Sequence, residues 1–293
     1  MRALHTTRPT DLMRVLLTGA NGMLAHAICA AAPAGVDLVA RTHEELDVAD
    51  GAQVAREVDA AKPQLILNTA AYTDVDGAEV DTQVVERVNA RAPGLLGRAA
   101  ARIGAKVVHF STDHVFDGES NAPYAEDAPT NPINGYGRSK LEGERALLES
   151  GARHLIIRTQ WLFGPAGRNF SSTMWARARE RIATRVVDDQ TGVPTSTEDL
   201  AAATWSLLDH DGILHIVNEG VASWYDVAER VFSTVGALHC LEHCSTNEFP
   251  TVARRPLHSV LSTSRLQRLG VALPPWQASL DQYIARITAT NAS

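Results

Sequence analysis

Short runs of apolar and β-branched residues alternate with Ala-rich amphipathic stretches along the first half of the chain. Runs that are nearly continuous in apolar residues are typical of parallel strands buried on both faces, and the stretches between them are typical of crossover helices. The strands are expected over 13–18, 36–41, 64–70, 105–112 and 154–159, and the helices over 26–32, 52–61, 82–102 and 136–149. This alternation predicts an α/β protein built on a doubly wound parallel (Rossmann) sheet.

The carboxy-terminal third of the chain has a more mixed pattern. Its helices are expected over 169–181, 197–209, 223–235 and 278–289, and a strand over 213–218. We expect residues 1–12 to be a disordered extension and residues 13–168 to form the Rossmann domain. Residues 169–293 should mainly form a smaller α/β lobe that binds the substrate, with some segments returning to the first domain. The ligand cleft is expected between the two, at the carboxyl ends of the strands.

The charge balance and the hydropathy exclude two classes of partner. The 293 residues include 27 basic and 34 acidic side chains, a formal charge of −7, and no cluster of Lys or Arg that would hold a nucleic-acid backbone. No apolar run reaches the roughly 18 residues that span a bilayer, and no apolar h-region follows the first basic residues. We therefore expect a cytoplasmic protein that binds neither nucleic acid nor a membrane.

The three cysteines, Cys29, Cys240 and Cys244, are too few for a disulfide framework in a chain of this length, which fits a reducing compartment. Two His-Cys pairs, at 239–240 and 243–244, would place metal-type ligands at i and i+4 if this segment were helical. The segment lies between Gly236 and Pro250, which favours a short strand with alternating side chains. No metal site is therefore predicted.

A glycine turn directly follows the first expected strand and opens the first helix. Gly19 permits the tight turn, and Gly22 lets backbone N–H groups approach a pyrophosphate that the helix amino terminus also stabilises. The G-x-x-G-x-x-A spacing over 19–25 differs from G-x-G-x-x-G, and an ordinary strand-to-helix connection would also explain two glycines. The position of the turn favours a dinucleotide site, whose further candidate residues here are Asn21, Met23 and Leu24.

The tip of the second strand indicates which coenzyme is bound. Arg41 stands there, with no Asp or Glu at the tip that could bind a free ribose 2′-hydroxyl. Because an Arg suits a 2′-phosphate, NADPH is favoured and NADH stays possible; the alternative is a solvated surface Arg. Downstream, Asp47 and Val48 are expected to hold the adenine. The segment 68–72 supplies small residues where the backbone must pass close to the coenzyme.

Two segments far apart in the sequence carry the candidate catalytic side chains. Thr112 lies at the carboxyl end of the fourth strand, and Tyr136 and Lys140 share one face of a helix at i and i+4. A nearby ammonium favours the phenolate, so Lys140 should lower the pKa of Tyr136 from its ordinary value of about 10. A Tyr and a Lys at this spacing also occur by chance on amphipathic helices. Their order after the glycine turn and Thr112 favours a catalytic set.

These features, in this order, resemble the extended short-chain dehydrogenase/reductase superfamily, and further motifs resemble its family of dTDP-4-dehydrorhamnose reductases. The likeness runs from about Met13 to the carboxy terminus. The matching segments are 68–76, 88–90, 111–118, 136–144, 158–164, 169–170, 188–195 and 254–256. One departure is His114, where the family usually has Tyr, and it concerns the sugar pocket.

The resemblance implies a reaction and a role for each catalytic residue. The family reduces the C4 ketone of dTDP-4-dehydro-L-rhamnose with NADPH to give dTDP-L-rhamnose. Tyr136 would donate a proton to the ketone oxygen as the nicotinamide delivers hydride to C4, and Lys140 would bind the nicotinamide ribose. Thr112 would hydrogen-bond the same carbonyl, and Asp113 would help to orient the sugar hydroxyls.

The resemblance also implies the residues that bind the two ligands. Trp161 would offer a flat apolar face to the deoxyhexose ring, and the Arg255 fork would match the phosphate oxygens of the nucleotide diphosphate. The further coenzyme contacts are Ala70, Ala71, Tyr72 and Asn89. The further sugar-nucleotide contacts are Thr73, Val75, Asp113, His114, Asn169, Phe170, Gln190, Gly192, Pro194 and Thr195.

Two other functions stay open. The chain could reduce another nucleotide-linked 4-keto-deoxysugar, or it could be a non-catalytic binding partner like the regulatory β-subunit of methionine adenosyltransferase, which resembles the same family. Trp161 and the Asp189-Gln190 pair fit a reductase better. A monomer and a homodimer are both compatible with the sequence. Since the closing segment 279–293 contains a single acidic residue, Asp281, no metal-bridged dimer is expected.

Overall fold

Six parallel strands form the central sheet of the protein, in a computed structural model that describes residues 12–290. Residues 1–11 of the expected extension lie outside the described residues. Along the sheet the order is β10 (Gly212–His215), β5 (Arg153–Thr159), β4 (Lys106–Thr112), β3 (Leu65–Asn68), β1 (Met13–Thr18) and β2 (Val36–Arg41). The predicted doubly wound sheet is confirmed. Each predicted strand is present, and its ends differ from the expected ends by three residues at most.

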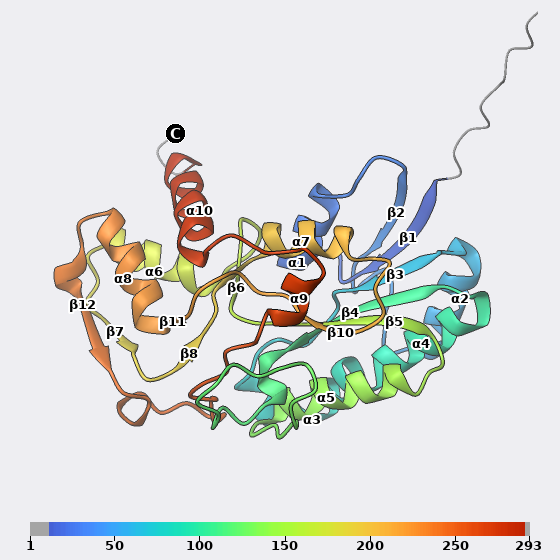
Figure 1. Cartoon of the computed structure of the whole chain (residues 1–293), viewed down its shortest axis with the longest axis horizontal. Helices are drawn as coiled ribbons and strands as arrows, with labels where there is room; N and C mark the ends of the chain where they lie inside the picture. Colours follow the sequence, from blue (N-terminus) through green and yellow to red (C-terminus); the bar gives the residue numbers. More distant parts are fainter. Residues whose placement is uncertain (1–11, 291–293) are drawn as a thin grey trace, which may run out of the picture.

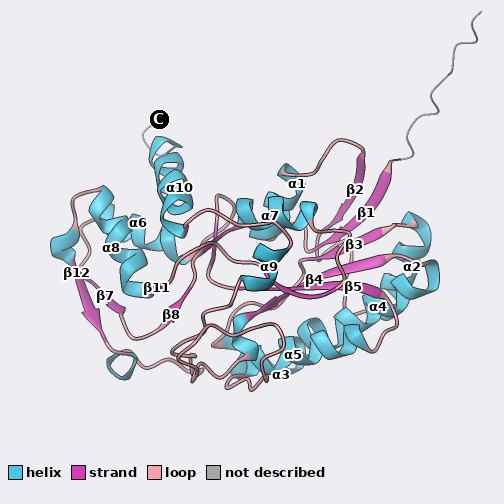
Figure 2. Ribbon diagram, in the orientation of Figure 1, coloured by secondary structure: helices cyan, strands magenta, loops and turns pink. Residues whose placement is uncertain are grey.

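Helices cover both faces of the sheet, as Figures 1 and 2 show. One face packs against α1 (Met23–Ala30), α7 (Thr197–Ser206) and α9 (Ser264–Arg268). The other packs against α2 (Gly51–Ala61), α4 (Ala92–Ile103) and α5 (Gly135–Leu148). Alternate residues of one strand serve the two layers: Val15 and Leu17 belong to the first core and Leu16 to the second. This double burial explains the nearly continuous apolar runs.

The helix expected over 82–102 is divided into three parts. A short α3 (Thr82–Val85) leads into a π-helical turn, Glu86–Arg91, and α4 begins at Ala92. The reason lies in Pro93, near the start of α4, because proline has no N–H to donate to the carbonyl four residues earlier. Apolar periodicity alone does not reveal this change of helix type.

A smaller lobe lies beside the sheet, at the left of Figure 1, and is built around a core of its own. Its helices are α6 (Phe170–Arg179), α8 (Trp224–Thr234) and α10 (Trp276–Thr290). Its strands are β6 (Leu162–Phe163), β7 (Thr184–Val187), β8 (Thr191–Gly192), β9 (Thr195–Ser196), β11 (Ala222–Ser223) and β12 (Leu241–Cys244). The predicted short strand after Gly236 is confirmed as β12, which pairs in parallel with β7.

The carboxy-terminal third of the chain also contributes to the main domain. It supplies strand β10 of the sheet and the helices α7 and α9 on one face. The order of the strands reverses direction between β1 and β3, since the chain passes from β1 to β2 at the edge and then to β3 on the other side. At such a reversal the loops after the two strands separate and leave a crevice at the carboxyl ends. No helix within residues 12–290 is long and apolar enough to cross a bilayer.

Helix α5 approaches the π-helical turn so closely that a side chain would not fit at Gly143. A Cβ atom there would overlap the carbonyl oxygen of Asn89 and would lie 3.1 Å from Cγ of Pro93. Gly137, on the same helix, has the same relation to the carbonyl oxygen of His114. Two backbone contacts therefore set the distance of α5 from its neighbours.

We predict that Gly143→Ala lowers the free energy of unfolding by about 1–3 kcal/mol, because α5 must move away from Asn89. Alanine would otherwise stabilise a helix relative to glycine, so the sign of the change is diagnostic. Denaturant unfolding measures it, with Arg145→Ala at an exposed position of α5 as the control. A Gly143→Ala variant as stable as the wild type would contradict the close approach.

Candidate active site

A cleft of about 670 Å³ opens at the carboxyl ends of the strands, between the sheet and the smaller lobe. It is lined by parts of α1, β4, α5, α6 and the segments after β3 and β5. Most of the residues predicted to bind the coenzyme or the sugar nucleotide lie there. They are Gly22, Met23, Leu24, Ala71, Thr73, Val75, Thr112, Asp113, His114, Tyr136, Lys140, Trp161, Asn169, Phe170, Gln190 and Arg255.

The glycine turn has the close backbone packing that a dinucleotide site requires. Gly19 adopts φ +73°, and a Cβ atom there would lie 2.8 Å from Cα of Ala70. The N–H of Gly22 donates to the carbonyl of Gly19 at 2.9 Å, and α1 starts at the next residue. The amino terminus of α1 therefore faces the cleft with unpaired N–H groups, as pyrophosphate binding needs.

A second observation also fits a bound polar ligand. The hydroxyl of Thr159, at the end of β5, lines the cleft and is buried with no hydrogen-bond partner in the described part of the chain. Because buried hydroxyls in proteins are normally paired, this oxygen is suited to a ligand group. Thr159 was not predicted from the sequence.

The residues predicted to surround the adenosine end have protein partners of their own. Arg41 donates from Nε to Glu57 of α2 at 2.8 Å, and Asp47 accepts from Arg87 at 3.1 Å. The side chain of Val48 is 3% exposed and belongs to the core beneath α2. Val48 therefore packs in this core and has little surface left for a ring.

Asn89 and Tyr72 are hydrogen-bonded to each other, and neither lines the cleft. The amide of Asn89 accepts from the N–H of Tyr72 and donates to its carbonyl, both at 2.9 Å. This pairing shapes the segment after β3, from which Ala71 and Thr73 reach the cleft. Asn89 is 1% exposed, so its role is to hold this loop in place. Asn21, in the glycine turn, is exposed and is absent from the lining of the cleft.

Tyr136 lies at the start of α5 with Thr112 and Asp113 beside it. Burial and the charge of Asp113 raise its pKa to about 12, and a hydrogen bond with Thr112 acts in the opposite direction. The phenol therefore keeps its proton throughout the neutral range, as a proton donor must. Lys140 is not among the groups that shift this pKa, so the predicted lowering by Lys140 stays a prediction.

The ammonium of Lys140 is turned toward the sheet. Its Nζ donates to the carbonyl oxygen of Phe110 at 2.6 Å and lies 3.4 Å from Nε2 of His109. A row of hydrogen bonds continues from His109 across the sheet. Nδ1 of His109 lies 3.0 Å from the amide nitrogen of Asn68, and Asn68 accepts from the hydroxyl of Thr18 at 2.7 Å. Burial lowers the pKa of Lys140 to about 8, and the carboxylate of Glu144 opposes the change. This orientation explains why Lys140 leaves the pKa of Tyr136 high.

His114 stands at the position of the family Tyr and faces the reacting residues. Its ring lies 5.5 Å from that of Tyr136 in an edge-on arrangement, and Nδ1 lies 2.9 Å from the Asn134 amide. Burial lowers the pKa of His114, while the charge of Asp113 opposes this. Asp113 is itself fixed by Gln160, whose Nε2 donates to it at 3.1 Å.

Aromatic side chains form the wall of the cleft on the side of the smaller lobe. Trp161 stacks face to face on Trp224, with ring centroids 3.7 Å apart, and Phe170 contacts Trp224 at 4.6 Å. Trp161 adopts φ +49°, which a non-glycine residue rarely does. Gly192 lies under the ring, where a Cβ atom would be 2.7 Å from Cε2 of Trp161. Gly192 therefore supports the wall from behind.

The remaining residues predicted to bind the sugar nucleotide are dispersed. Arg255 lines the cleft and pairs with Asp76 at 3.0 Å. Gln190 also lines it, with Nε2 bonded to Thr246 at 3.0 Å, whereas Asn169 caps α6. Pro194 is buried, and Thr195 is 0% exposed with its hydroxyl bonded to the carbonyl of Val193. Thr195 is therefore a core residue, because β9 runs beneath the aromatic wall.

Several lining residues were missed by the sequence analysis. Trp224 follows an N-cap Ser at the start of α8, and Gln160 directly precedes the predicted Trp161. Arg168 and Ser259 come from loops. Gln160 could have been found from the sequence, because it lies in the matching segment 158–164. Trp224 could not, because a tryptophan at the start of a helix looks like a core residue in the sequence.

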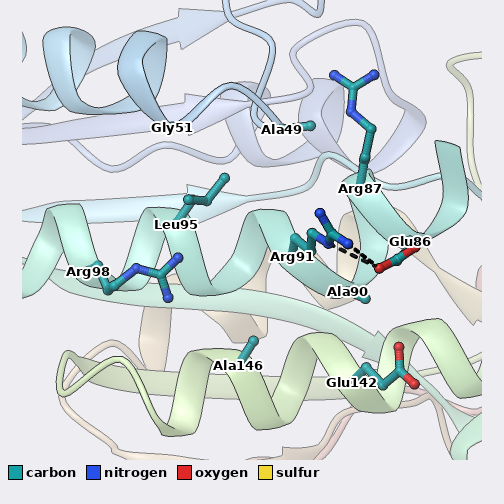
Figure 3. A pocket seen from close by; sticks show the side chains of 10 residues that line it. All are labelled: Ala49, Gly51, Glu86, Arg87, Ala90, Arg91, Leu95, Arg98, Glu142 and Ala146. Atoms are coloured by element: carbon teal, nitrogen blue, oxygen red, sulfur yellow. Dashed lines mark hydrogen bonds and ion pairs between the residues drawn. The ribbon is translucent and has the colours of Figure 1, made fainter. Parts of the chain in front are cut away.

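A second pocket, of about 630 Å³, lies on the outer surface between α2, the π-helical turn and α5 (Figure 3). Two of its three arginines pair with carboxylates: Arg91 with Glu86, and Arg87 with Asp47. None of the proposed catalytic residues lines this pocket. All four predicted catalytic residues line the cleft at the strand ends instead.

The sheet, the glycine turn and the Tyr-Lys helix face together define an extended short-chain dehydrogenase/reductase. The family model described as "RmlD substrate binding domain" matches residues 13–289. The chain therefore belongs to this family.

Individual relatives agree over nearly their whole length. The dTDP-4-dehydrorhamnose reductase of Burkholderia thailandensis is 37% identical, covering 90% of this chain and 96% of that protein. A probable dTDP-4,6-dihydroxy-2-methyloxan-3-one 4-ketoreductase of Streptomyces antibioticus is 40% identical, covering 95% and 97%. The crystal structure of the Bacillus anthracis dTDP-4-dehydrorhamnose reductase in complex with NADP has a TM-score of 0.91 and 34% identity, covering 94% and 99%.

We predict that Gly192→Ala disrupts the aromatic wall, because the added methyl group would push Trp161 off Trp224. The near-ultraviolet circular dichroism of tryptophan should change, and stability should fall by about 1–3 kcal/mol. Val221→Ala, an exposed residue just before β11, is the control. An unaltered spectrum with unaltered stability would mean that Gly192 does not support Trp161.

Proposed function

We propose that this protein is an NADPH-dependent reductase that converts the C4 ketone of dTDP-4-dehydro-L-rhamnose to the alcohol of dTDP-L-rhamnose. The observation that carries the proposal is the meeting of Thr112, Tyr136 and Lys140 in one cleft with the glycine turn. Relatives that bear the name of this activity, and the NADP-bound structure of one of them, support the substrate and the coenzyme.

Each part of the cleft has a task in this reaction. The coenzyme, when bound at the glycine turn and Lys140, supplies the hydride. Tyr136 hydrogen-bonds the ketone oxygen and gives its proton to that oxygen as negative charge develops there. The Thr112 hydroxyl, which donates to Asp113 at 2.9 Å, would turn to the same oxygen when the ketone is bound. With a pKa of about 12, the phenol holds the proton until an alkoxide, which is a stronger base, is formed. The third N–H of Lys140 is left to bind a ribose hydroxyl.

A second candidate substrate is another nucleotide-linked 4-keto-deoxysugar. The observation that favours it is His114, which replaces the family Tyr beside Tyr136. The relative from Streptomyces antibioticus, named a probable 4-ketoreductase of a different dTDP-sugar, supports the same alternative. Incubation with NADPH and a panel of dTDP-keto-sugars, with identification of each product, decides between the two. If no sugar of the panel leads to consumption of NADPH, the protein would be a binding subunit instead.

Tyr136→Phe removes the proton donor alone. We expect kcat to fall by roughly 10²–10⁴, the usual contribution of a positioned acid, while NADPH binding is nearly unchanged. Stopped assays and fluorescence titration measure the two quantities, with Tyr225→Phe in the smaller lobe as the matched control. Retention of most of the activity would reject Tyr136 as the acid and leave Asp113 or His114 in its place.

The preference for NADPH is expected to depend on Arg41 and on its partner Glu57. Arg41→Ala should lower kcat/KM for NADPH roughly ten-fold to hundred-fold and leave NADH little changed, since one charge-assisted contact is lost. Glu57→Gln should raise the preference for NADPH, because the guanidinium no longer has a competing carboxylate at 2.8 Å. Equal kcat/KM for the two coenzymes in the wild type would refute this assignment.

We also propose a cytoplasmic protein that acts as a monomer or a homodimer on a diffusible sugar nucleotide. The substrate class is that of the named relatives. Sedimentation at micromolar concentration separates the two oligomeric states, and a magnesium chelator should leave both the state and the activity unchanged.

A further inference from the structure

Three residues of α5 lie at intervals of four along one face of the helix: Tyr136, Lys140 and Glu144. Side chains at i, i+4 and i+8 of a helix follow one another along the same side. The first two line the cleft, whereas Glu144 lies one turn deeper and is 1% exposed. A carboxylate buried to this extent needs partners that replace water.

Glu144 has three such contacts, from two strands. Ser111 of β4 donates from its hydroxyl to Oε1 at 2.5 Å. Arg158 of β5 donates from Nε to Oε1 at 2.9 Å and from a terminal nitrogen to Oε2 at 2.7 Å. Arg158 is itself 3% exposed and lies over the ring of Phe116. The pair is therefore bidentate and shielded from solvent.

The positions of these partners connect the pair to the reaction site. Ser111 directly precedes Thr112, which is proposed to bind the ketone. Arg158 directly precedes Thr159, whose unpaired hydroxyl lines the cleft. The carboxylate of Glu144 thus links the helix that carries Tyr136 and Lys140 to both strand ends that they face.

The charges around Lys140 make Glu144 its counter-charge. On β4, His109 is held neutral because burial and the Lys140 charge keep its pKa well below the ordinary value. On α5, Tyr136 retains its proton, and on the turn after β4, Asp113 is engaged with Thr112 and Gln160. Arg158 on β5 lies behind Glu144. The carboxylate of Glu144 is the charge that raises the pKa of Lys140 against the effect of burial.

We propose that Glu144 is a positioning residue of the active site, which fixes α5 against β4 and β5 and places a carboxylate one helical turn from Lys140. The pairing with Arg158 and Ser111 gives the carboxylate a single orientation. The inference rests on the proposed function of Tyr136 and Lys140. A buried ion pair is weak evidence for stability, since apolar residues often replace one without loss. The test therefore measures Lys140 itself and kcat, and not stability alone.

The test is a direct titration of Lys140 by nuclear magnetic resonance. The chain contains three lysines, Lys62, Lys106 and Lys140, so a protein labelled with [ε-¹³C]lysine gives three signals, and Lys140→Met assigns one of them. Glu144→Gln removes the charge and keeps an acceptor, whereas Glu144→Asp keeps the charge and shortens the reach. Glu142→Gln is the matched control, because this exposed residue of α5 lines the outer pocket in Figure 3.

In the wild type Lys140 should titrate near pH 8. Glu144→Gln should lower this midpoint by about 1 pH unit, the usual effect of losing one nearby opposite charge. As the pH rises, the variant should therefore lose activity at a correspondingly lower pH than the wild type. Glu144→Asp should leave the midpoint in place and lower kcat roughly ten-fold or more, because α5 is no longer held at the right distance. Glu142→Gln should change neither quantity.

An unchanged midpoint in folded Glu144→Gln overturns the proposal. Should that variant not fold, Glu144→Asp decides, and a folded Glu144→Asp with wild-type kcat and KM overturns the proposal as well. The titration needs no substrate. A wild-type protein that reduces no sugar nucleotide would therefore reject the proposed function, while the titration would still report on the charge of Lys140.

Discussion

A row of buried side-chain hydrogen bonds runs across the sheet and ends at Lys140. It passes from Thr18 on β1 to Asn68 on β3, then to His109 on β4 and to the ammonium on α5. Each of these polar groups is costly to bury alone, so each constrains the next. The row fixes how far the strands extend relative to one another, and thereby where the glycine turn, Thr112 and the helix α5 meet.

The same burial acts on the two proposed catalytic groups in opposite directions. It raises the pKa of the Tyr136 phenol and lowers that of the Lys140 ammonium, because a site with little water disfavours either charged form. A buried side chain in such a site keeps its charge only where a nearby group of opposite charge stabilises it. This explains why carboxylates at Asp113 and Glu144 matter here although neither needs to touch the ketone.

Much of the fold and of the site could be predicted from the sequence. Strands buried on both faces and the glycine turn at 19–22 depend on local residue types, and the spacing of Tyr136 and Lys140 depends on helix geometry alone. The direction in which Lys140 points could not be predicted, because the Phe110 carbonyl that attracts it belongs to another element. The burial of Val48 and Thr195 and the partner of Arg41 depend in the same way on tertiary contacts.

The ion pair between Arg255 and Asp76 has a consequence for the exchange of ligands. Asp76 also accepts from the N–H of Ala253 at 2.9 Å, so it holds the guanidinium and the backbone of the same segment. An anion that enters the cleft must take Arg255 from a carboxylate that is always present at high local concentration. Such an internal competitor reduces the net gain that an anion obtains from binding Arg255.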